Sequence, residues 1–135
     1  MSNENVRDRI LIVDDEEPIR HLFSETFTKA GGYDVETARD GYEAVEKAMS
    51  EDFDVILMDM MMPGMNGLDA IKALKITRPM VPILIVTGGT DQIIAEGLAS
   101  GAAMAFRKPV VGETLVQAVR NILTNVGKSG RKEEP

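Results

Sequence analysis

The chain has 135 residues, 44% of them hydrophobic, which suits one domain with a buried core and argues against wholesale disorder. Its net charge of −7 repels nucleic acid and anionic membrane surfaces, so we expect this domain to bind neither directly. The sequence has no cysteine, no signal-peptide core in residues 1–8 and no apolar stretch near the ~20 residues of a membrane span, so we expect a cytoplasmic protein.

Short apolar segments alternate along the chain with amphipathic segments of helical period. In chain order we expect a strand at Ile10–Val13, a helix at Pro18–Ala30, a strand at Val35–Ala38, a helix at Gly41–Ser50, a strand at Val55–Met58, a helix at about Gly67–Thr77, a strand at Ile83–Val86, a helix at about Asp91–Ser100, a strand at about Ala103–Arg107 and a helix at Glu113–Asn125. Most of the strands are continuously apolar, which is typical of strands buried on both faces. Repeated strand–helix units predict an α/β fold, in which right-handed crossovers place helices on both faces of a parallel sheet.

Local signals mark the ends of the elements and of the domain. Pro18 suits the first turn of a helix, and Asp40 is a suitable N-cap for the helix that follows it. We expect a single domain over residues 9–126. Residues 1–8 are predicted to be a flexible N-terminus, and residues 127–135 to be a flexible tail or the start of a linker.

Polar side chains follow four of the predicted strands. Asp14 and Asp15 come after the first strand, Asp59 after the third, Thr87 after the fourth and Lys108 after the fifth. In an open parallel sheet the carboxyl ends of the strands converge on one crevice, and ligands bind there. Carboxylates, a hydroxyl and an ammonium group in that crevice suit a divalent cation and a phosphoryl group.

Asp59 is a candidate phosphoryl acceptor. A carboxylate is a weak nucleophile that repels an anionic phosphoryl group, and a divalent cation held beside it removes that repulsion. Mg²⁺ binds one or two carboxylates together with waters and phosphoryl oxygens, and Asp14, Asp15 and Asp59 supply suitable acids. The Lys108 ammonium group can pair with the remaining phosphoryl oxygens, and the Thr87 hydroxyl can donate a hydrogen bond to one of them.

The same strand ends carry a series of short motifs in a fixed order. They are Asp14-Asp15, Asp59 with Met62-Pro63-Gly64 and Asn66-Gly67, Thr87-Gly88, and Lys108-Pro109. Any one motif is weak evidence, whereas the ordered set is a strong signal. With this set the sequence resembles the CheY-like receiver domain of two-component response regulators, over about Arg9–Asn125. The resemblance implies a flavodoxin-like (βα)5 doubly wound parallel sheet with strand order 2-1-3-4-5.

The resemblance also implies roles for the acidic residues. Asp59 would take a phosphoryl group from a sensor histidine kinase or a phosphotransfer protein. Asp15 would bind Mg²⁺ directly, and Asp14 would bind it mostly through water. The backbone carbonyl of Met61 would be a further metal ligand.

The remaining implied roles concern switching. Thr87 would move toward the phosphoryl group, Lys108 would contact it, and the Lys108–Pro109 peptide bond would be cis. The surface of the fourth helix, fifth strand and fifth helix would then change for a downstream protein or for an effector domain that this sequence does not contain. Homodimers form through the same face in this family. The protein would be a signalling switch that assists its own phosphorylation and dephosphorylation, not an enzyme.

One position departs from the pattern of the family. Receivers commonly carry Tyr or Phe three residues before the lysine, and that ring swings inward on phosphorylation, but Ala105 stands there in this sequence. Strand alternation should send the neighbouring Phe106 to the opposite face of the sheet. The signal would then depend on Thr87 and on the loop of residues 88–90, whose two glycines give it unusual backbone freedom. Gly88 should also leave the approach to Asp59 open.

Several residues have simpler interpretations. The acids that follow Val13 could serve only to begin a helix, Asp59 could be an ordinary turn residue, and Thr87 could merely end a strand. His21 suggests a phosphohistidine relay, but a lone histidine on a solvated helix is the better interpretation. The methionines at positions 60–62 and 65 suggest a soft-metal site, but without cysteine or a nearby histidine they favour flexible packing.

Other classes of protein fit this sequence less well than a receiver does. A haloacid-dehalogenase-type phosphatase needs a second acid two residues after its nucleophile, where this chain has Met61. A flavodoxin-like FMN protein needs a phosphate loop rich in Ser, Thr and Gly, where this chain has four successive acids, and the P-loop signature is absent. A degenerate receiver that works only as a docking module stays open, since Ala105 favours it and the complete acid–Thr–Lys set argues against it. Mg²⁺ affinity would separate the two.

Overall fold

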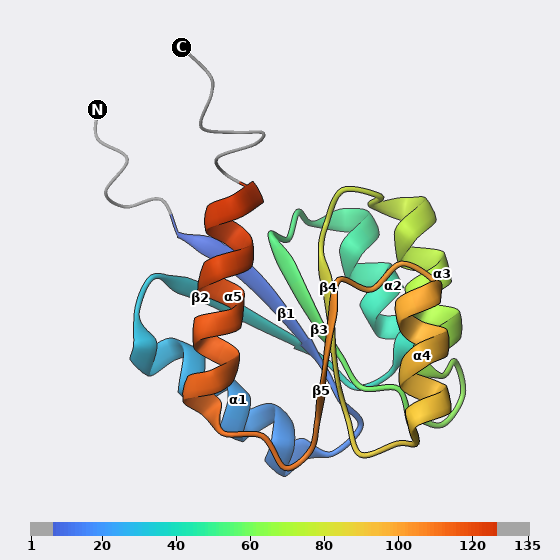
Figure 1. The fold of residues 1–135 in the computed structure, drawn as a ribbon. Coiled ribbons are helices and arrows are strands. Elements are labelled where there is room, and N and C mark those ends of the chain that lie inside the picture. The colour runs from blue at the N-terminus through green and yellow to red at the C-terminus, as the bar shows by residue number, and fades with distance from the viewer. Residues whose placement is uncertain (1–6, 127–135) are drawn as a thin grey trace.

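The computed structural model describes residues 7–126 as one sheet flanked by helices (Figure 1). In chain order the elements are β1 (Asp8–Val13), α1 (Glu17–Ala30), β2 (Tyr33–Ala38), α2 (Gly41–Ser50), β3 (Val55–Met58), α3 (Gly67–Thr77), β4 (Ile83–Thr87), α4 (Asp91–Ala99), β5 (Met104–Arg107) and α5 (Gly112–Val126). The strands are parallel and lie in the order β2-β1-β3-β4-β5, so the predicted fold class and strand order are confirmed. Over residues 7–126, none of the helices is long and apolar enough to cross a membrane.

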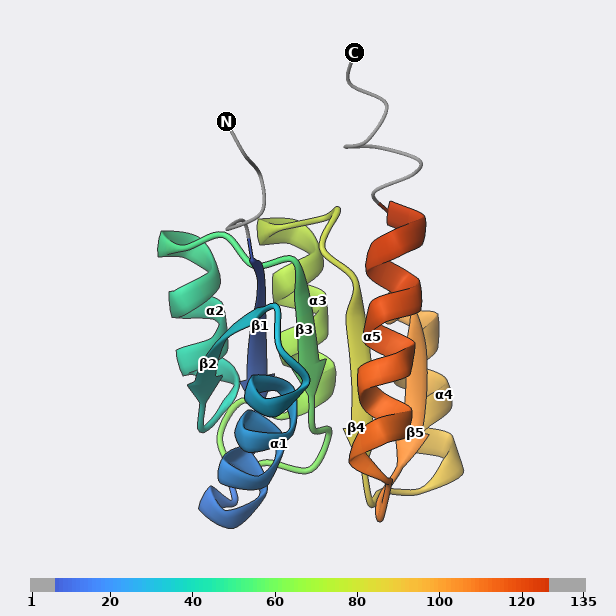
Figure 2. The same ribbon diagram turned by 90° about the vertical axis from the view of Figure 1, so that its left-hand side faces the viewer.

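Helices cover both faces of the sheet, with α1 and α5 on one face and α2, α3 and α4 on the other (Figures 1 and 2). Successive residues of a strand point to opposite faces. Leu11 and Val13 of β1 therefore pack in the core beneath α2, α3 and α4, whereas Ile10 and Ile12 pack in the core beneath α1 and α5. Because both faces are buried, the strands appear in the sequence as continuous apolar runs.

The ends of the elements agree with the sequence-based prediction to within one or two residues. The expectation of a flexible segment up to residue 8 needs correction at Asp8, which belongs to β1. The Asp8 N–H donates to the Gly32 carbonyl oxygen at 3.1 Å, and Asp8 pairs with Tyr33 at the start of β2. β1 starts earlier than predicted because Asp8 pairs with β2, and the hydrophobicity of either strand alone does not reveal this pairing. Residues 1–6 and the predicted tail at residues 127–135 lie outside the described part of the chain.

Side-chain caps begin three of the helices near the carboxyl edge of the sheet. Asp40, Asn66 and Thr90 each accept a hydrogen bond from the backbone N–H three residues later, at 2.8, 2.9 and 3.2 Å respectively. The predicted N-cap role of Asp40 is confirmed. The other two caps fix the starts of α3 and α4.

Gly67, the first residue of α3, is expected to be intolerant of alanine. A Cβ atom there would lie 2.4 Å from Met60 Cα and 2.5 Å from the Asp59 carbonyl oxygen. Since backbone atoms cannot give way without moving the loop after Asp59, we expect Gly67→Ala to lower the free energy of unfolding by roughly 1–3 kcal/mol. Urea denaturation would measure this, with Gly88→Ala as the control, because a Cβ at Gly88 meets nothing within 4 Å. Equal stability of the two variants would show that the loop accommodates the methyl group.

Candidate functional site

The order of the strands brings the polar strand-end residues together. β1 and β3 are neighbours, and the Asp59 N–H donates to the Val13 carbonyl oxygen at 3.0 Å, which holds Asp59 beside Asp14. Across β4 and β5, the Lys108 N–H donates to the Thr87 carbonyl oxygen at 2.8 Å. These backbone bonds extend the parallel ladders by one residue past the strands. They place the side chains of four candidate site residues along one edge of the sheet.

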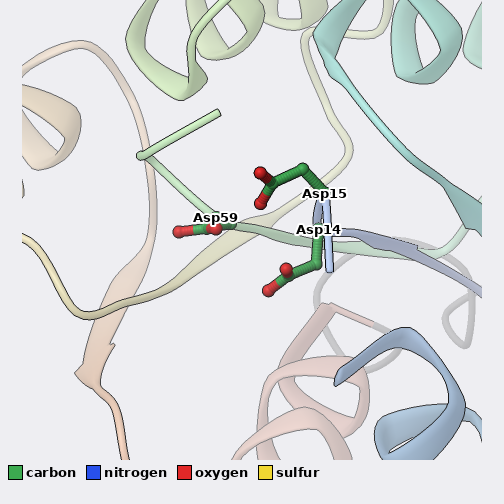
Figure 3. Close-up of side chains that lie close together, drawn as sticks. All are labelled: Asp14, Asp15 and Asp59. Carbon is green, nitrogen blue, oxygen red and sulfur yellow. The ribbon is translucent and has the colours of Figure 1, made fainter. Parts of the chain in front are cut away.

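The carboxylates of Asp14, Asp15 and Asp59 extend into the same space at the ends of β1 and β3 (Figure 3). One oxygen from each lies within 4.8 Å of the others. Asp14 and Asp59 are only 2% and 5% exposed, whereas Asp15 is exposed. An all-oxygen set with one solvent-facing member suits Mg²⁺, which keeps several of its waters.

Lys108 faces this acidic cluster. Its Nζ lies 2.6 Å from Asp14 Oδ2 and 3.6 Å from Asp59 Oδ2. Burial lowers the pKa of Lys108, but the hydrogen bond with Asp14 and the charges of Asp59, Asp14 and Glu16 together outweigh burial and raise it overall. The ammonium group therefore stays charged. Since one ammonium group does not balance three carboxylates, the cluster still attracts a cation.

The environment of Asp59 disfavours its charged form. Burial is the largest cause of a raised Asp59 pKa, and the charge of Asp14 raises it further. The charge of Lys108, the Met61 N–H at 3.2 Å from Asp59 Oδ1, and the Thr87 hydroxyl lower the pKa without outweighing burial. A desolvated carboxylate beside a second acid gains stability when a cation or a bound electrophile removes its charge.

Asp59 is expected to reduce the stability of the fold at neutral pH when no divalent cation is present. The pKa of Asp59 is higher in the folded chain than its value of about 3.9 in the unfolded chain, so the folded state holds more protons between the two values. The free energy of unfolding therefore falls as the pH rises from the unfolded pKa through the folded pKa. Asp59→Asn removes this cost and should raise the free energy of unfolding near pH 7 by roughly 0.5–2 kcal/mol. Urea unfolding of both proteins in EDTA across a pH series would measure the gain. A gain that does not shrink as pH falls below the unfolded pKa would contradict this origin.

Thr87 ends β4 with a fully buried side chain. Its hydroxyl helps to lower the pKa of Asp59 and accepts a hydrogen bond from the Gly89 N–H at 3.2 Å. Gly88 lies between Thr87 and Gly89, and a Cβ atom added to it would meet nothing within 4 Å. That Gly88 leaves the approach to Asp59 open stays a prediction.

The two residues in the middle of β5 face opposite sides of the sheet, as alternation predicted. Ala105 packs against the core beneath α2, α3 and α4, whereas Phe106 packs against the core beneath α1 and α5. The ring of Phe106 therefore lies on the opposite face of the sheet from Ala105, so it cannot make the inward movement that the family's usual aromatic ring makes. The Lys108–Pro109 bond is cis, as the resemblance implied.

The alternative metal and relay sites find little support in the structure. Met60 and Met62 are buried in the core while Met61 is exposed, which fits packing around the loop. His21 is exposed on α1, and its Nε2 lies 3.7 Å from a carboxylate oxygen of Glu25. The Met61 carbonyl as a metal ligand stays a prediction.

Two residues near the site were missed by the sequence analysis. A Cβ at Gly97 in α4 would lie 2.4 Å from Ile85 Cδ1, so this glycine lets α4 lie close to β4. An isolated glycine inside a helical pattern is a signal that could have found it. Arg107 hydrogen-bonds the Gly89 carbonyl oxygen and the Asp91 carboxylate. No local pattern marks Arg107, because both partners are distant in sequence.

Residues 10–120 match the family model described as "Response regulator receiver domain". The chain belongs to this family. The fold, the strand order and the acidic triad Asp14, Asp15 and Asp59 are those of a receiver, and the triad is typical of the receiver metal site. A receiver domain is a signalling switch of two-component systems and not a catalytic enzyme.

The chain is similar to proteins of quite different lengths. It is 34% identical over 119 residues to sporulation initiation phosphotransferase F of Bacillus subtilis, which covers 87% of this chain and 95% of that protein. It is 38% identical over 116 residues to the alkaline phosphatase synthesis transcriptional regulatory protein PhoP of the same species, where 85% of this chain covers 48% of the relative. The chain thus spans nearly all of the first relative and about half of the second.

Among solved structures, the chain is similar to the chemotaxis protein CheY4 of Vibrio cholerae. The TM-score is 0.80 and the sequences are 39% identical, over 86% of this chain and 98% of CheY4. A receiver that matches almost end to end supports the same fold over the described residues.

Proposed function

We propose that the protein is the phosphoacceptor receiver of a two-component system, in which Asp59 takes a phosphoryl group from a phosphohistidine in the presence of Mg²⁺. The observation that carries this proposal is the buried carboxylate of Asp59 within 4.8 Å of two further carboxylates and 3.6 Å from the Lys108 ammonium group. This arrangement supplies an oxygen nucleophile, a cation site and a fixed positive charge in one place. Similarity to a protein named as a phosphotransferase supports it.

The proposed transfer is a displacement at phosphorus. An oxygen of Asp59 bonds to phosphorus as the P–N bond to the donor's protonated imidazole breaks, and neutral imidazole leaves. Lys108 is close enough to Asp59 to pair with an oxygen of the transferred group, and the buried Thr87 hydroxyl donates a hydrogen bond to another. Later attack by water at phosphorus restores the carboxylate and releases inorganic phosphate.

The acidic cluster fits Mg²⁺ because its three oxygens converge and one acid remains open to solvent. We assign Asp15 as a direct ligand, Asp14 as a ligand mostly through water, and the Met61 carbonyl as a further ligand beside Asp59. When bound, Mg²⁺ neutralises charge on the transferred group. Asp14 also holds Lys108 at 2.6 Å, so this acid positions the ammonium group next to the acceptor.

The partner is a sensor histidine kinase or a phosphotransfer protein in the cytoplasm. The output is a change in the surface of α4, β5 and α5, which begins at the loop after Thr87. A downstream protein or an effector domain reads that surface, or a second copy of the chain binds it. The relative PhoP, named as a transcriptional regulator, has as much chain again outside the matched region, which supports the effector alternative.

The test is the intact mass of the protein after incubation with acetyl phosphate, with Mg²⁺ or with EDTA. We expect the mass of one phosphoryl group to be added with Mg²⁺ and nothing with EDTA. Beryllofluoride, which mimics a phosphoryl group on a carboxylate, should bind under the same conditions. If Mg²⁺ bound but neither reagent modified the protein, the phosphoacceptor function would be refuted and a docking role favoured.

A further inference from the structure

Arg107, the last residue of β5, connects that strand to the loop between β4 and α4. Its guanidinium group donates one hydrogen bond to the Gly89 carbonyl oxygen and another to the Asp91 carboxylate. Arg107 is the register partner of Thr87 across the two strands, so its side chain starts beside Thr87 and reaches over the loop that follows. The Asp91 side chain is 97% exposed, whereas the contact with Gly89 is partly buried. Asp91 therefore anchors the guanidinium group from the outside.

The backbone of Gly89 contacts both Arg107 and Thr87. The Gly89 N–H donates to Thr87 Oγ1 at 3.2 Å. A hydroxyl has a single proton to donate, and an N–H that occupies one of its lone pairs leaves that proton for another acceptor. That proton stays available to a group on the neighbouring Asp59, whose pKa the Thr87 hydroxyl helps to lower. A chain of hydrogen bonds thus runs from Arg107 through Gly89 to Thr87.

The loop itself does little to fix Gly89. Two successive glycines have more backbone freedom than any other pair of residues, and neither Gly88 nor Gly89 has a positive φ that would require glycine. A Cβ at Gly88 would meet nothing within 4 Å, and the atoms nearest to one at Gly89 would be side-chain atoms of Met61 and Thr87, at 3.4 Å. The guanidinium group of Arg107 is therefore a restraint on the Gly89 carbonyl from outside the loop.

We propose that Arg107 is a positioning residue, which holds Gly89 so that the Thr87 hydroxyl faces a phosphoryl group on Asp59. This inference rests on the proposed function of Asp59 and adds a residue that touches none of the reacting atoms. Arginine suits the role because its planar fork binds the carbonyl and the carboxylate together, which a lysine ammonium group does with less geometric restraint.

The experiment measures beryllofluoride binding to the full chain in the presence of Mg²⁺. We expect Arg107→Ala to weaken binding by about threefold to tenfold, the range for loss of a hydrogen bond. Mg²⁺ affinity without beryllofluoride should not change, because the carboxylates are untouched. Arg107→Lys should restore part of the loss, which a purely steric role would not explain.

The chain offers a matched control at the other edge of the sheet. Arg7 also hydrogen-bonds one carbonyl oxygen, that of Tyr33, and one carboxylate, that of Asp34, and its side chain is 44% exposed against 45% for Arg107. Arg7→Ala should leave beryllofluoride binding unchanged. An equal loss in both variants would show a general effect on the fold and would overturn the proposal.

A double-mutant cycle with Thr87→Ala decides whether Arg107 acts through Thr87. We expect Arg107→Ala to have no further effect on beryllofluoride binding once the hydroxyl is gone. The same loss in both backgrounds, or no loss in either, would overturn the positioning role while the proposed function stands. If the wild-type protein itself failed to bind beryllofluoride with Mg²⁺, the proposed function would be refuted, and this inference with it.

Discussion

Asp59→Asn is expected to abolish Mg²⁺-dependent phosphorylation by acetyl phosphate. An amide is not a nucleophile toward phosphorus under these conditions, and the other two acids are placed differently. Asp14 is held by the Lys108 ammonium group at 2.6 Å and by the Glu16 N–H at 2.9 Å, and Asp15 is solvent-exposed. Intact mass spectrometry of both proteins after identical incubation would show a phosphoryl gain in the wild type only.

The same variant carries its own control for folding. Since Asp59 is a buried carboxylate with a raised pKa, its replacement by a neutral isostere should leave the fold intact and more stable in EDTA. Loss of phosphorylation together with a gain in stability identifies Asp59 as a residue kept for function at a cost in stability. Undiminished phosphorylation of Asp59→Asn would place the acceptor elsewhere and refute the assignment.

Asp15→Ala is expected to abolish measurable Mg²⁺ binding. Asp15 is the solvent-facing member of the acidic triad, and its removal leaves two buried acids that both pair with Lys108. Because loss of an outer partner of a metal ligand typically costs about 10–100-fold in affinity, loss of a direct ligand should cost at least the upper end of that range. Isothermal titration of the metal-free protein with Mg²⁺ would measure it.

Asp52→Ala is the matched control for Asp15→Ala. Asp52 is also an exposed aspartate, but it lies between α2 and β3, where its carboxylate contacts Arg78 at 3.2 Å. The Asp52→Ala protein should bind Mg²⁺ with wild-type affinity and be phosphorylated to the same extent as the wild type. Wild-type Mg²⁺ affinity in Asp15→Ala would show that the acidic triad is not the metal site.

The resemblance to receivers implied the strand order, whereas the meeting of the polar residues was predicted for a physical reason. Parallel strands buried on both faces appear as short continuous apolar runs, so their ends can be located to within a residue or two. Once β1 and β3 are neighbours, Asp14 and Asp59 must lie together at the carboxyl edge. The ladder bond from Asp59 to Val13 is the direct consequence.

What the sequence did not reveal depends on distances between side chains from different elements. Lys108 was expected near the acids, but only the structure shows that it binds Asp14 more closely than Asp59. In the sequence Arg107 is an ordinary polar residue at the end of a strand, and only the structure shows its hydrogen bond to Gly89 in the loop before α4. The start of β1 at Asp8 likewise depends on the position of β2.

These details bear on how the proposed switch operates without an aromatic ring at position 105. Phe106 is committed to the core beneath α1 and α5, so it cannot take the place of the missing ring. In our proposal the route from Asp59 to the outer surface runs instead through Thr87, the glycine pair and Arg107. Arg107 is partly exposed at the edge strand of the sheet, so a change in the loop after β4 reaches the surface of α4 and β5 within one side chain.

The position of the phosphoryl group on the wild-type protein tests the central claim most directly. After incubation with acetyl phosphate and Mg²⁺, borohydride reduction converts an aspartyl phosphate to homoserine, and tandem mass spectrometry of the peptides identifies the modified residue. We expect homoserine at position 59 and at no other aspartate, and none when EDTA replaces Mg²⁺. Modification at Asp14 or Asp15, a phosphoryl group on His21, or no modification of Asp59 would contradict the phosphoacceptor role.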